Sequence, residues 1–172
     1  KDEKVVAVGE CGFDFYYNDK NELLERQEAL LRGQIAIARK YGLPLSFHVR
    51  EAFDDFWRVF ESYSGISGVL HSFTDRPVHL ERAIKYGLSI GINGIASFIS
   101  HSWQRDMFKS IPLENIVIET DAPFLTPHPK RGTINTPENV IYITNFLAEL
   151  RGEEPSTIAK VTTANAQKLF NL

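Results

Sequence analysis

The sequence has a single cysteine, no block of like charges and no apolar run of membrane-spanning length. Because Cys11 has no partner within the chain, an internal disulfide is excluded, which fits a reducing cytoplasm. With a net charge of −3 and no basic stretch, the chain has neither an acidic tail nor a basic nucleic-acid arm. We therefore expect a cytoplasmic protein that makes no membrane contact and holds any charged partner through a local site.

Short β-rich runs alternate with longer runs of helical period, and no low-complexity linker interrupts them. With 172 residues, 43% of them hydrophobic, the chain can bury one sizeable core, so residues 1–172 are expected to form a single domain. Consecutive strands joined through a helix run in the same direction, so we expect a parallel sheet. The expected strands cover residues 5–10, 45–49, 68–73, 88–93 and 116–121, and the expected helices cover residues 21–41, 52–60, 78–86, 103–109, 137–150 and 156–170.

A parallel sheet of this kind is either open or closed into a barrel. An open sheet usually carries a glycine-rich phosphate loop after its first strand, and neither G-x-G-x-x-G nor G-x-x-x-x-G-K-[ST] occurs here. In a (βα)8 barrel, the strand ends converge on one mouth where the chemistry is found. The pattern favours an α/β fold of the TIM (βα)8 barrel class, because four expected strands end at a residue that can ligate a metal: Glu10, His48, His71 and Asp121.

Each of these four residues also has a structural interpretation. Glu10 fits a salt-bridged carboxylate, Asp121 fits a turn before Pro123, and both histidines, His48 and His71, fit hydrogen-bonded core residues. Taken singly, the structural interpretation is the better one. Together, two carboxylates and two imidazoles form the donor set that borderline divalent cations prefer, and a cation would offset the repulsion between buried carboxylates.

The same residues fall within motifs that resemble the family of TatD-type metal-dependent deoxyribonucleases. Residues 9–14 (GECGFD) resemble its G-E-x-G-[LF]-D segment, and residues 68–73 (GVLHSF) resemble its G-V-x-H-x-F strand. Residues 119–123 (ETDAP) resemble its E-T-D-[AS]-P signature. Because further motifs follow in the same order along essentially the whole chain, the resemblance is specific; they are HVR at 48–50, SIGING at 89–94, IPL at 111–113, RG at 131–132, N-x-P at 135–137 and TANAQKLF at 163–170.

The resemblance implies a barrel related to the amidohydrolase superfamily, one or two divalent metal ions per subunit, and hydrolysis of phosphodiester bonds in DNA by a metal-activated water. It implies that Glu10, His48, His71 and Asp121 are metal ligands. Glu10 and Asp121 would be the catalytic carboxylates, with Glu10 contacting the metal pair and Asp121 orienting or deprotonating the attacking water. The expected ion is Mg2+, with Zn2+ and Mn2+ as alternatives.

Three polar residues are candidates for substrate binding. Arg50 shares a strand face with His48, so its guanidinium can grip a phosphate, although a structural carboxylate is an equally good partner. Arg131 and Asn135 belong to the long loop after Asp121, where barrel enzymes keep substrate contacts.

For other residues near these motifs, the sequence indicates a functional role less clearly. Glu119 fits structural support and orientation of a ligand equally well. His79 is expected at the surface, whereas His101 and His128 fall in loops that could line a substrate path. The aromatic residues that follow Glu10 fit either a base-stacking platform or packing over the barrel end, so they receive no assignment; they are Phe13, Phe15, Tyr16 and Tyr17.

One family feature is absent from this sequence. TatD-type enzymes begin with a strand carrying His-x-His and a following Asp, which complete the first metal site. Because a (βα)8 barrel usually runs to about 250 residues, roughly 80 residues are absent, and the visible strands would be the fourth through eighth, so the chain would hold the last five βα units. We expect the sequence to be part of a longer protein; a companion fragment or a truly short product are the alternatives.

The expected function is therefore a TatD-like deoxyribonuclease, acting as an exonuclease on single-stranded or frayed DNA ends. An acidic protein without a basic stripe is poorly suited to following duplex DNA. We expect a monomer whose partner is DNA. Two alternatives stay open: an inactive truncated barrel that serves as an interaction module, and an enzyme that uses the same ligands to hydrolyse a small amide or ester.

Overall fold

The computed structural model describes residues 2–17 and 19–172, which fall into two compact units. The first unit comprises the chain up to His71 together with Leu169–Leu172, and the second comprises Ser72–Lys168. Within each unit, the neighbouring strands run parallel and are connected through helices. The predicted α/β alternation and strand direction are therefore confirmed.

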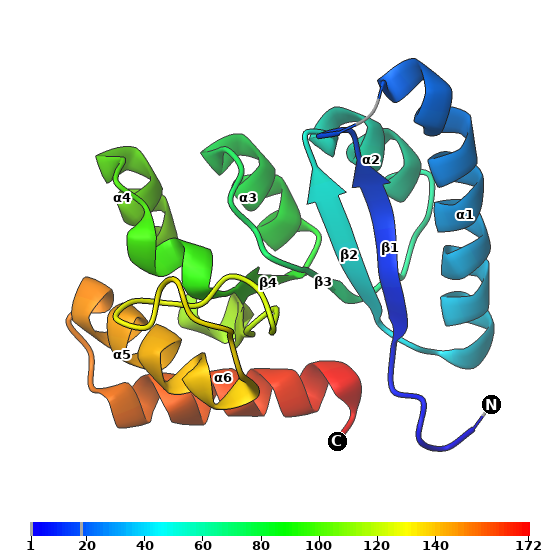
Figure 1. The fold of residues 1–172 in the computed structure, drawn as a ribbon. Coiled ribbons are helices and arrows are strands. Elements are labelled where there is room, and N and C mark those ends of the chain that lie inside the picture. Colours follow the sequence, from blue (N-terminus) through cyan, green and yellow to red (C-terminus); the bar gives the residue numbers. More distant parts are fainter. Residues whose placement is uncertain (1, 18) are drawn as a thin grey trace. The chain divides into compact units, whose positions relative to one another are not determined.

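The first unit is a parallel sheet with helices packed against it (Figure 1). Strand β1 (Val8–Asp14) pairs with β2 (Leu45–Arg50), and β2 pairs with β3 (Gly68–Leu70). Helix α1 (Lys20–Tyr41) connects β1 to β2, and helix α2 (Phe53–Phe60) connects β2 to β3.

Helix α1 has clear start and stop signals. The Asp19 side chain accepts a hydrogen bond from the backbone N–H of Asn21 at 2.8 Å, which satisfies one of the free donors at the helix start. Gly42 adopts the left-handed conformation with φ of 62° and ends the helix. Leu31 and Ile35, one turn apart, are fully buried, so this face of α1 packs on β1.

An aromatic cluster joins α2 to the sheet. The Phe47 ring on β2 lies 5.1 Å from the Phe56 ring and 5.8 Å from the Phe60 ring, both in edge-to-face geometry. All three side chains are buried, and each contributes about 1.5–3 kcal/mol through removal from water. Because Phe47 directly precedes His48, this core fixes the strand segment from which His48 projects.

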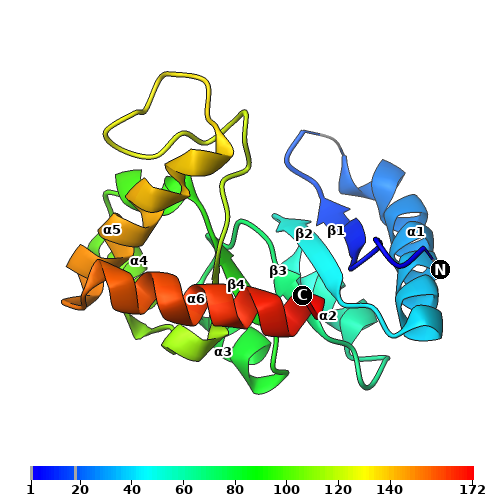
Figure 2. The same ribbon diagram turned by 90° about the horizontal axis from the view of Figure 1, so that it is seen from below.

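The second unit contains the parallel pair β4 (Ser89–Ile92) and β5 (Ile116–Ile118), with Ile90 opposite Ile116. Figure 2 shows the long loop after β5 projecting beyond α5. Asn165 of α6 donates hydrogen bonds to the carbonyls of Leu113 and Ile116 at 2.9 and 2.8 Å, which fixes the start of β5. The helices are α3 (Pro77–Lys85), α4 (Ser102–Ser110), α5 (Val140–Arg151) and α6 (Pro155–Phe170), and the 3-10 turns cover Gly94–Phe98, Leu113–Asn115 and Pro137–Asn139.

The helix predictions are accurate to within a few residues, but three strand predictions are not. Strand β1 begins at Val8 and continues to Asp14, so Glu10 lies inside the strand and not at its end. Strands β3 and β5 are shorter than predicted. An apolar run marks what is buried, whereas a strand ends where its hydrogen-bonding partner ends, which the run does not encode.

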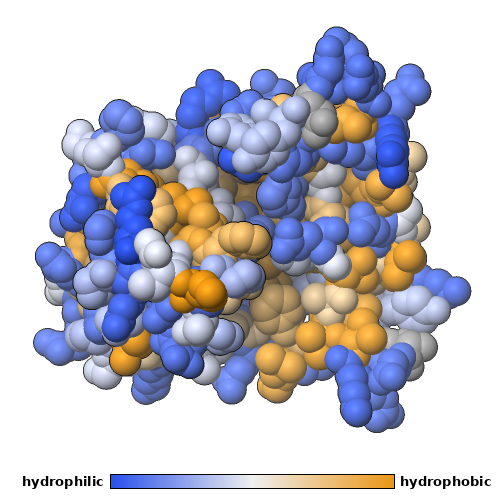
Figure 3. All heavy atoms as spheres, in the orientation of Figure 1, coloured by the Kyte–Doolittle hydropathy of each residue, from blue (hydrophilic) through white to orange (hydrophobic). Residues whose placement is uncertain are grey.

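The helices present charged faces. Hydrophilic side chains gather over the first turns of α1 in Figure 3. Among the described residues, no helix combines the length and the apolarity needed to cross a membrane.

Candidate metal centre

Three side chains of the first unit converge beside the sheet. The Glu10 carboxylate lies 3.7 Å from Nδ1 of His48 and 3.8 Å from Nε2 of His71. The side chain of His71 is 9% exposed and that of Glu10 is 54% exposed, so the group opens to solvent on the Glu10 side. The structure thus brings together three of the four residues predicted to ligate a metal.

An irregularity in β1 positions Glu10. Val8 pairs with Leu45, whereas Cys11 pairs with Phe47, so an advance of three residues along β1 corresponds to an advance of two residues along β2. Such a bulge bends the strand locally and re-aims a side chain, as is common next to functional sites. Glu10 lies inside this bulge.

His48 and His71 are placed by neighbouring strands. His48 lies within β2, and His71 follows the last residue of β3, with its backbone N–H donating to the Phe47 carbonyl at 2.9 Å. Their rings are 6.1 Å apart between centroids and inclined by 32°. Because the strands are parallel and in register, both imidazoles reach the same edge of the sheet.

Asp14 is a functional candidate that the sequence reasoning missed. Its Oδ2 lies 2.9 Å from Nε2 of His48, on the opposite side of the ring from Glu10. Partial burial raises the pKa of the Asp14 carboxyl, but hydrogen bonds from the Tyr16 backbone and from His48 outweigh it, so the pKa lies below its usual range. The ionised Asp14 carboxylate can accept a hydrogen bond from Nε2–H of His48. In the neutral imidazole that carries its proton on Nε2, the lone pair on Nδ1 then faces Glu10.

Helix α1 supports this arrangement. The Gln27 side chain accepts from the Asp14 backbone N–H at 3.0 Å and donates to its carbonyl at 3.1 Å, and Gln34 donates to the Glu10 carbonyl at 3.3 Å. Between α1 and β1 lies a cavity of about 370 Å³. Its lining includes Glu10, Asp14 and His48, so the cavity reaches the imidazole and both carboxylates that flank its ring nitrogens.

The chemistry and spacing of the three side chains fit a divalent cation. Ions that bind nitrogen and oxygen ligands at about 2.0–2.2 Å can hold two ligand atoms no more than about 4.4 Å apart. The Glu10 to His48 and Glu10 to His71 distances of 3.7 and 3.8 Å meet this limit. One ligand atom from each of the three residues lies within 4.8 Å of the others, slightly wider than the limit, so a small side-chain rotation would bring all three onto one ion. Two imidazoles and a carboxylate match the donors that Zn2+ and Mn2+ accept.

Cys11, next to Glu10, takes no part in this group. Its side chain is buried, and its thiol lies 3.5 Å from the Ser46 carbonyl, to which it donates. Burial, and secondly the Glu10 charge, raise the pKa of the thiol to about 12. A protonated thiol is a poor metal ligand and nucleophile.

Asp121, the fourth predicted ligand, belongs to the second unit, where it follows β5 and adopts a positive φ of 59°. Its role as a ligand therefore stays a prediction. Two residues earlier, Glu119 accepts a hydrogen bond from the Ser72 backbone N–H at 2.5 Å. A Cβ added at Gly91 would lie 2.9 Å from the Glu119 carboxylate. The carboxylate therefore occupies space that is free because residue 91 has no side chain.

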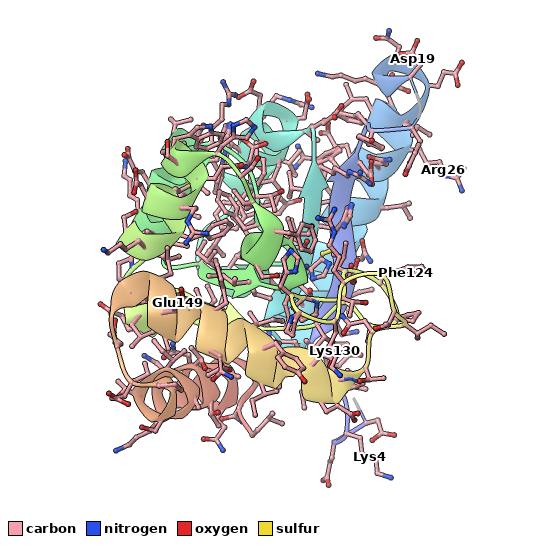
Figure 4. All side chains as sticks on the ribbon, turned by 60° about the vertical axis from the view of Figure 1, so that its left-hand side comes forward. Lys4, Asp19, Arg26, Phe124, Lys130 and Glu149 are labelled. Atoms are coloured by element: carbon pink, nitrogen blue, oxygen red, sulfur yellow. The ribbon has the colours of Figure 1, made fainter. Side chains whose placement is uncertain are left out.

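The predicted substrate-binding residues lie in different settings. Arg50 is exposed at the end of β2, and Arg131 is exposed in the loop after β5, with its guanidinium 4.3 Å from the Phe98 ring centroid. Asn135 is buried, and its side chain donates to the carbonyls of Thr120 and Phe124 at 2.8 and 2.6 Å. Labels at Phe124 and Lys130 mark this loop in Figure 4.

Asn135 uses its whole amide group within the loop, because its oxygen also accepts from the Thr136 backbone and from the Asn139 side chain. The structure therefore shows Asn135 as an organiser of the loop. Direct contact with a substrate stays a prediction.

The prediction that His79 lies at the surface is wrong. His79 is 4% exposed on the buried face of α3. Its Nε2 lies 3.2 Å from Nη2 of Arg76 and 3.6 Å from Oδ1 of Asp75, so polar partners accompany its burial. Asp14, by contrast, had a signal in the sequence, since it closes the motif that begins at Gly9.

Comparison with known proteins gives one consistent family. Residues 1–171 match the sequence profile of the family described as TatD related DNase. The chain is 34% identical to the uncharacterized metal-dependent hydrolase YabD of Bacillus subtilis, over 99% of this chain and 67% of that protein. It is 37% identical to a protein of Rahnella sp. named 3'-5' ssDNA/RNA exonuclease TatD, over 98% of this chain and 66% of that protein.

The crystal structure of YjjV, a TatD homologue from Escherichia coli K12, superposes with a TM-score of 0.89 at 33% identity, over 99% of this chain and 65% of YjjV. The predicted fold class, an α/β barrel of the metal-dependent hydrolase type, is thereby confirmed. The chain spans about two thirds of the length of the curated relatives it matches, with 67, 64 and 64% in three of them.

Proposed function

The chain belongs to the family of TatD-related DNases, and on this premise we propose that it forms part of a metal-dependent hydrolase that cleaves phosphodiester bonds at single-stranded or frayed ends of DNA. The observation that carries the proposal is the convergence of Glu10, His48 and His71 within 4.8 Å. The name of the Rahnella relative supports a nucleic-acid substrate and an exonuclease action. We further propose that the protein acts as a monomer in the cytoplasm.

Glu10, His48 and His71 would hold the metal, and Asp14 would keep His48 in the tautomer that presents Nδ1. A divalent cation held by these residues would lower the pKa of a bound water toward neutrality and would place positive charge near the phosphoryl oxygens. We propose Mg2+ as the ion in use, with Zn2+ and Mn2+ as alternatives. Solvent access on the Glu10 side leaves a path by which a phosphate can reach the three side chains.

The remaining proposed roles belong to charged residues outside this group of three. We propose Asp121 as a further ligand that orients or deprotonates the attacking water. Arg50 and Arg131, both exposed, would hold phosphate oxygens and offset the negative charge that develops on them. Asn135 would serve the substrate through the loop that its four hydrogen bonds organise.

The test compares two carboxylate variants of the natural full-length protein. Glu10→Gln keeps the size of the side chain but removes its charge, and Glu22→Gln makes the same change at an exposed position in the first turn of α1. We expect Glu10→Gln to lower both the bound metal and the metal-stimulated release of nucleotides from a single-stranded oligonucleotide, by more than about 100-fold in rate. Glu22→Gln should match the wild type in both.

Three further outcomes bear on the proposal. A Glu10→Gln variant as active as the wild type would contradict the metal centre. If Asp121→Ala also keeps full activity, its proposed role is wrong. If the wild type binds metal but releases nucleotides from neither DNA nor RNA, the nuclease proposal fails.

A further inference from the structure

An exposed aromatic and cationic cluster lies at the end of the first two strands. The Arg50 guanidinium lies 3.5 Å from the centroid of the Tyr16 ring and 5.4 Å from that of Tyr17. The two tyrosine rings are 4.5 Å apart and nearly perpendicular, at 88°. Tyr16 is 48% exposed and Tyr17 is 80% exposed, so one cation and two rings face the solvent together.

Packing does not account for these two rings. Of the four aromatic residues after Glu10, Phe13 is buried and its ring lies 5.9 Å from that of Phe15, within the unit. Tyr16 and Tyr17 come next and remain exposed. Exposure of an apolar ring to water is unfavourable, so covering it with a ligand is favourable, and aromatic rings are enriched where proteins bind partners.

The cluster adjoins the metal centre through the backbone. Arg50 pairs with Asp14 across the two strands, two residues beyond the pair Gly12 and His48, which is about 6.6 Å farther along the strands. The backbone N–H of Tyr16 donates to Oδ1 of Asp14 at 2.9 Å, and Oδ2 of Asp14 binds His48. One carboxylate therefore links the cluster to a proposed metal ligand.

We propose that Tyr16, Tyr17 and Arg50 form a binding site for one unpaired nucleotide of a single strand, in which the base stacks on Tyr17 and the guanidinium pairs with the adjoining phosphate. Proteins that bind single strands without reading sequence combine aromatic rings that stack bases with positive charges that hold the backbone. An aromatic peptide would use the rings but not the phosphate contact of Arg50. This inference rests on the proposed function and names the recognition element for its substrate.

Binding is tested without hydrolysis by fluorescence anisotropy in EDTA, with three labelled probes: oligothymidylate, oligouridylate and an abasic deoxyribose phosphate oligomer of equal length. We expect the wild type to prefer the probes with bases. Tyr17→Ala should weaken binding of those probes about 5- to 140-fold, the change that a stacking loss of about 1–3 kcal/mol gives at about 1.4 kcal/mol per tenfold, and should leave the abasic probe unchanged. Tyr17→Phe, which keeps the ring, should retain the preference.

Matched variants separate stacking from charge and from general surface effects. Arg50→Gln should weaken binding of all three probes and reduce the slope of log affinity against log salt by about 0.7, the value for one phosphate of a single strand. Tyr41→Ala is the control, because Tyr41 is also exposed and also lies under a cation, with Lys40 Nζ 5.3 Å from its ring, but at the far end of α1. It should bind like the wild type.

Equal affinity of the wild type for probes with and without bases would overturn the proposal, as would equal losses on all probes in Tyr17→Ala. A Tyr17 effect on either DNA or RNA supports it, and the probe affected identifies the source of the base. Base-dependent binding without metal-stimulated hydrolysis would keep this site and reject the nuclease, whereas hydrolysis without base-dependent binding would do the reverse.

Discussion

At the scale of single residues, one hydrogen bond determines which nitrogen of His48 faces Glu10. Asp14 binds Nε2 at 2.9 Å, and its pKa is held below the usual range, so it remains an ionised acceptor at neutral pH. An imidazole whose Nε2 carries the proton has its lone pair on Nδ1, which lies 3.7 Å from Glu10. In many metal sites a carboxylate binds one ring nitrogen of a histidine and the other nitrogen binds the metal. Asp14 and His48 have the first half of this arrangement.

We predict that Asp14→Asn weakens metal binding by about 10- to 100-fold, because a neutral amide holds the imidazole less firmly and makes it less basic. The measurement is calorimetric titration with Mn2+ at neutral pH. Asp54→Asn, an exposed carboxylate at the start of α2, is the matched control and should leave the affinity unchanged. Equal affinities of Asp14→Asn and the wild type would show that Asp14 has only a structural role.

We also predict that Cys11 resists alkylation in the folded protein. Its thiol is buried and has a pKa raised to about 12, so the reactive thiolate is scarce at pH 8. Mass spectrometry after iodoacetamide treatment should find no modification within the time that fully labels the same protein in urea. Rapid labelling without denaturant would mean that β1 opens at Cys11.

The site residues differ in how far the sequence reveals them. Glu10, His48 and His71 stand at fixed places in three strand motifs, and parallel strands bring such positions together. The contribution of Asp14 depends on the register of β1 against β2, in which a bulge shifts the pairing between Val8 and Cys11. A bulge leaves little trace in the hydrophobic pattern, so the contact between Asp14 and His48 could not be predicted.

At the scale of elements, the pairing of β1 with β2 depends on a glycine. Gly12 has a φ of 149°, and a Cβ added there would lie 2.0 Å from the His48 carbonyl oxygen. No flexible side chain can move aside, because the obstacle is backbone. The strand that carries His48 can therefore approach β1 only where residue 12 has no side chain.

We predict opposite effects of two glycine to alanine changes. Gly12→Ala should lower the free energy of unfolding by more than about 2 kcal/mol and weaken metal binding, because both strain and a backbone clash oppose the native pairing. Gly33→Ala, in the interior of α1 with nothing within 4 Å of the new Cβ, should raise it by about 0.5–1 kcal/mol. Urea denaturation checks both, and a neutral Gly12→Ala would contradict the close approach.

The loop after β5 is held by the Asn135 amide. We predict that Asn135→Ala destabilises this loop by about 2–4 kcal/mol, because it leaves two partly buried carbonyls and two donors without their partner. Hydrogen exchange of residues 120–139 should accelerate. Asn145→Ala, an exposed residue of α5, is the control and should leave exchange in this loop unchanged. Unchanged exchange in Asn135→Ala as well would show that other contacts hold the loop.

Elements were predictable to different degrees for physical reasons. Helix α1 carries its own signals, with a capping aspartate at Asp19 and a left-handed Gly42, so its bounds follow from local sequence. Strand β5 ends at Ile118, three residues earlier than the apolar run predicts, because its end depends on pairing with β4. The end of a strand depends on the strand that pairs with it, which lies far away in the sequence, so the local run of apolar residues does not predict it.

At the scale of the whole molecule, the order of motifs along the chain identified the fold better than any single pattern. The likeness to YjjV over 99% of the chain confirms the barrel class. Local sequence did not indicate the division after His71 into two compact units, because no linker composition marks it. Two statements stay predictions: that the five visible strands are the fourth through eighth of a barrel, and that residues 1–172 form one domain.

This division gives a test of the proposed fourth ligand. Glu10, His48 and His71 all belong to the first unit, whereas Asp121 belongs to the second. A metal at 100 times its dissociation constant stabilises the state that binds it by about 2.7 kcal/mol, which slows exchange through opening of that state about 100-fold. We predict that Mn2+ slows hydrogen exchange in β1, β2 and β3 and also in residues 119–123, if Asp121 is a ligand.

Helix α4, which carries none of the proposed ligands, is the internal control and should exchange at the same rate with and without Mn2+. Glu10→Gln should abolish the protection in both segments, because one site would be responsible for both. Protection confined to β1, β2 and β3 would show that the metal is held by the first unit alone and would remove Asp121 from the ligand set. Protection of residues 119–123 that survives Glu10→Gln would instead indicate a separate ion near Asp121, and the single shared centre would be wrong.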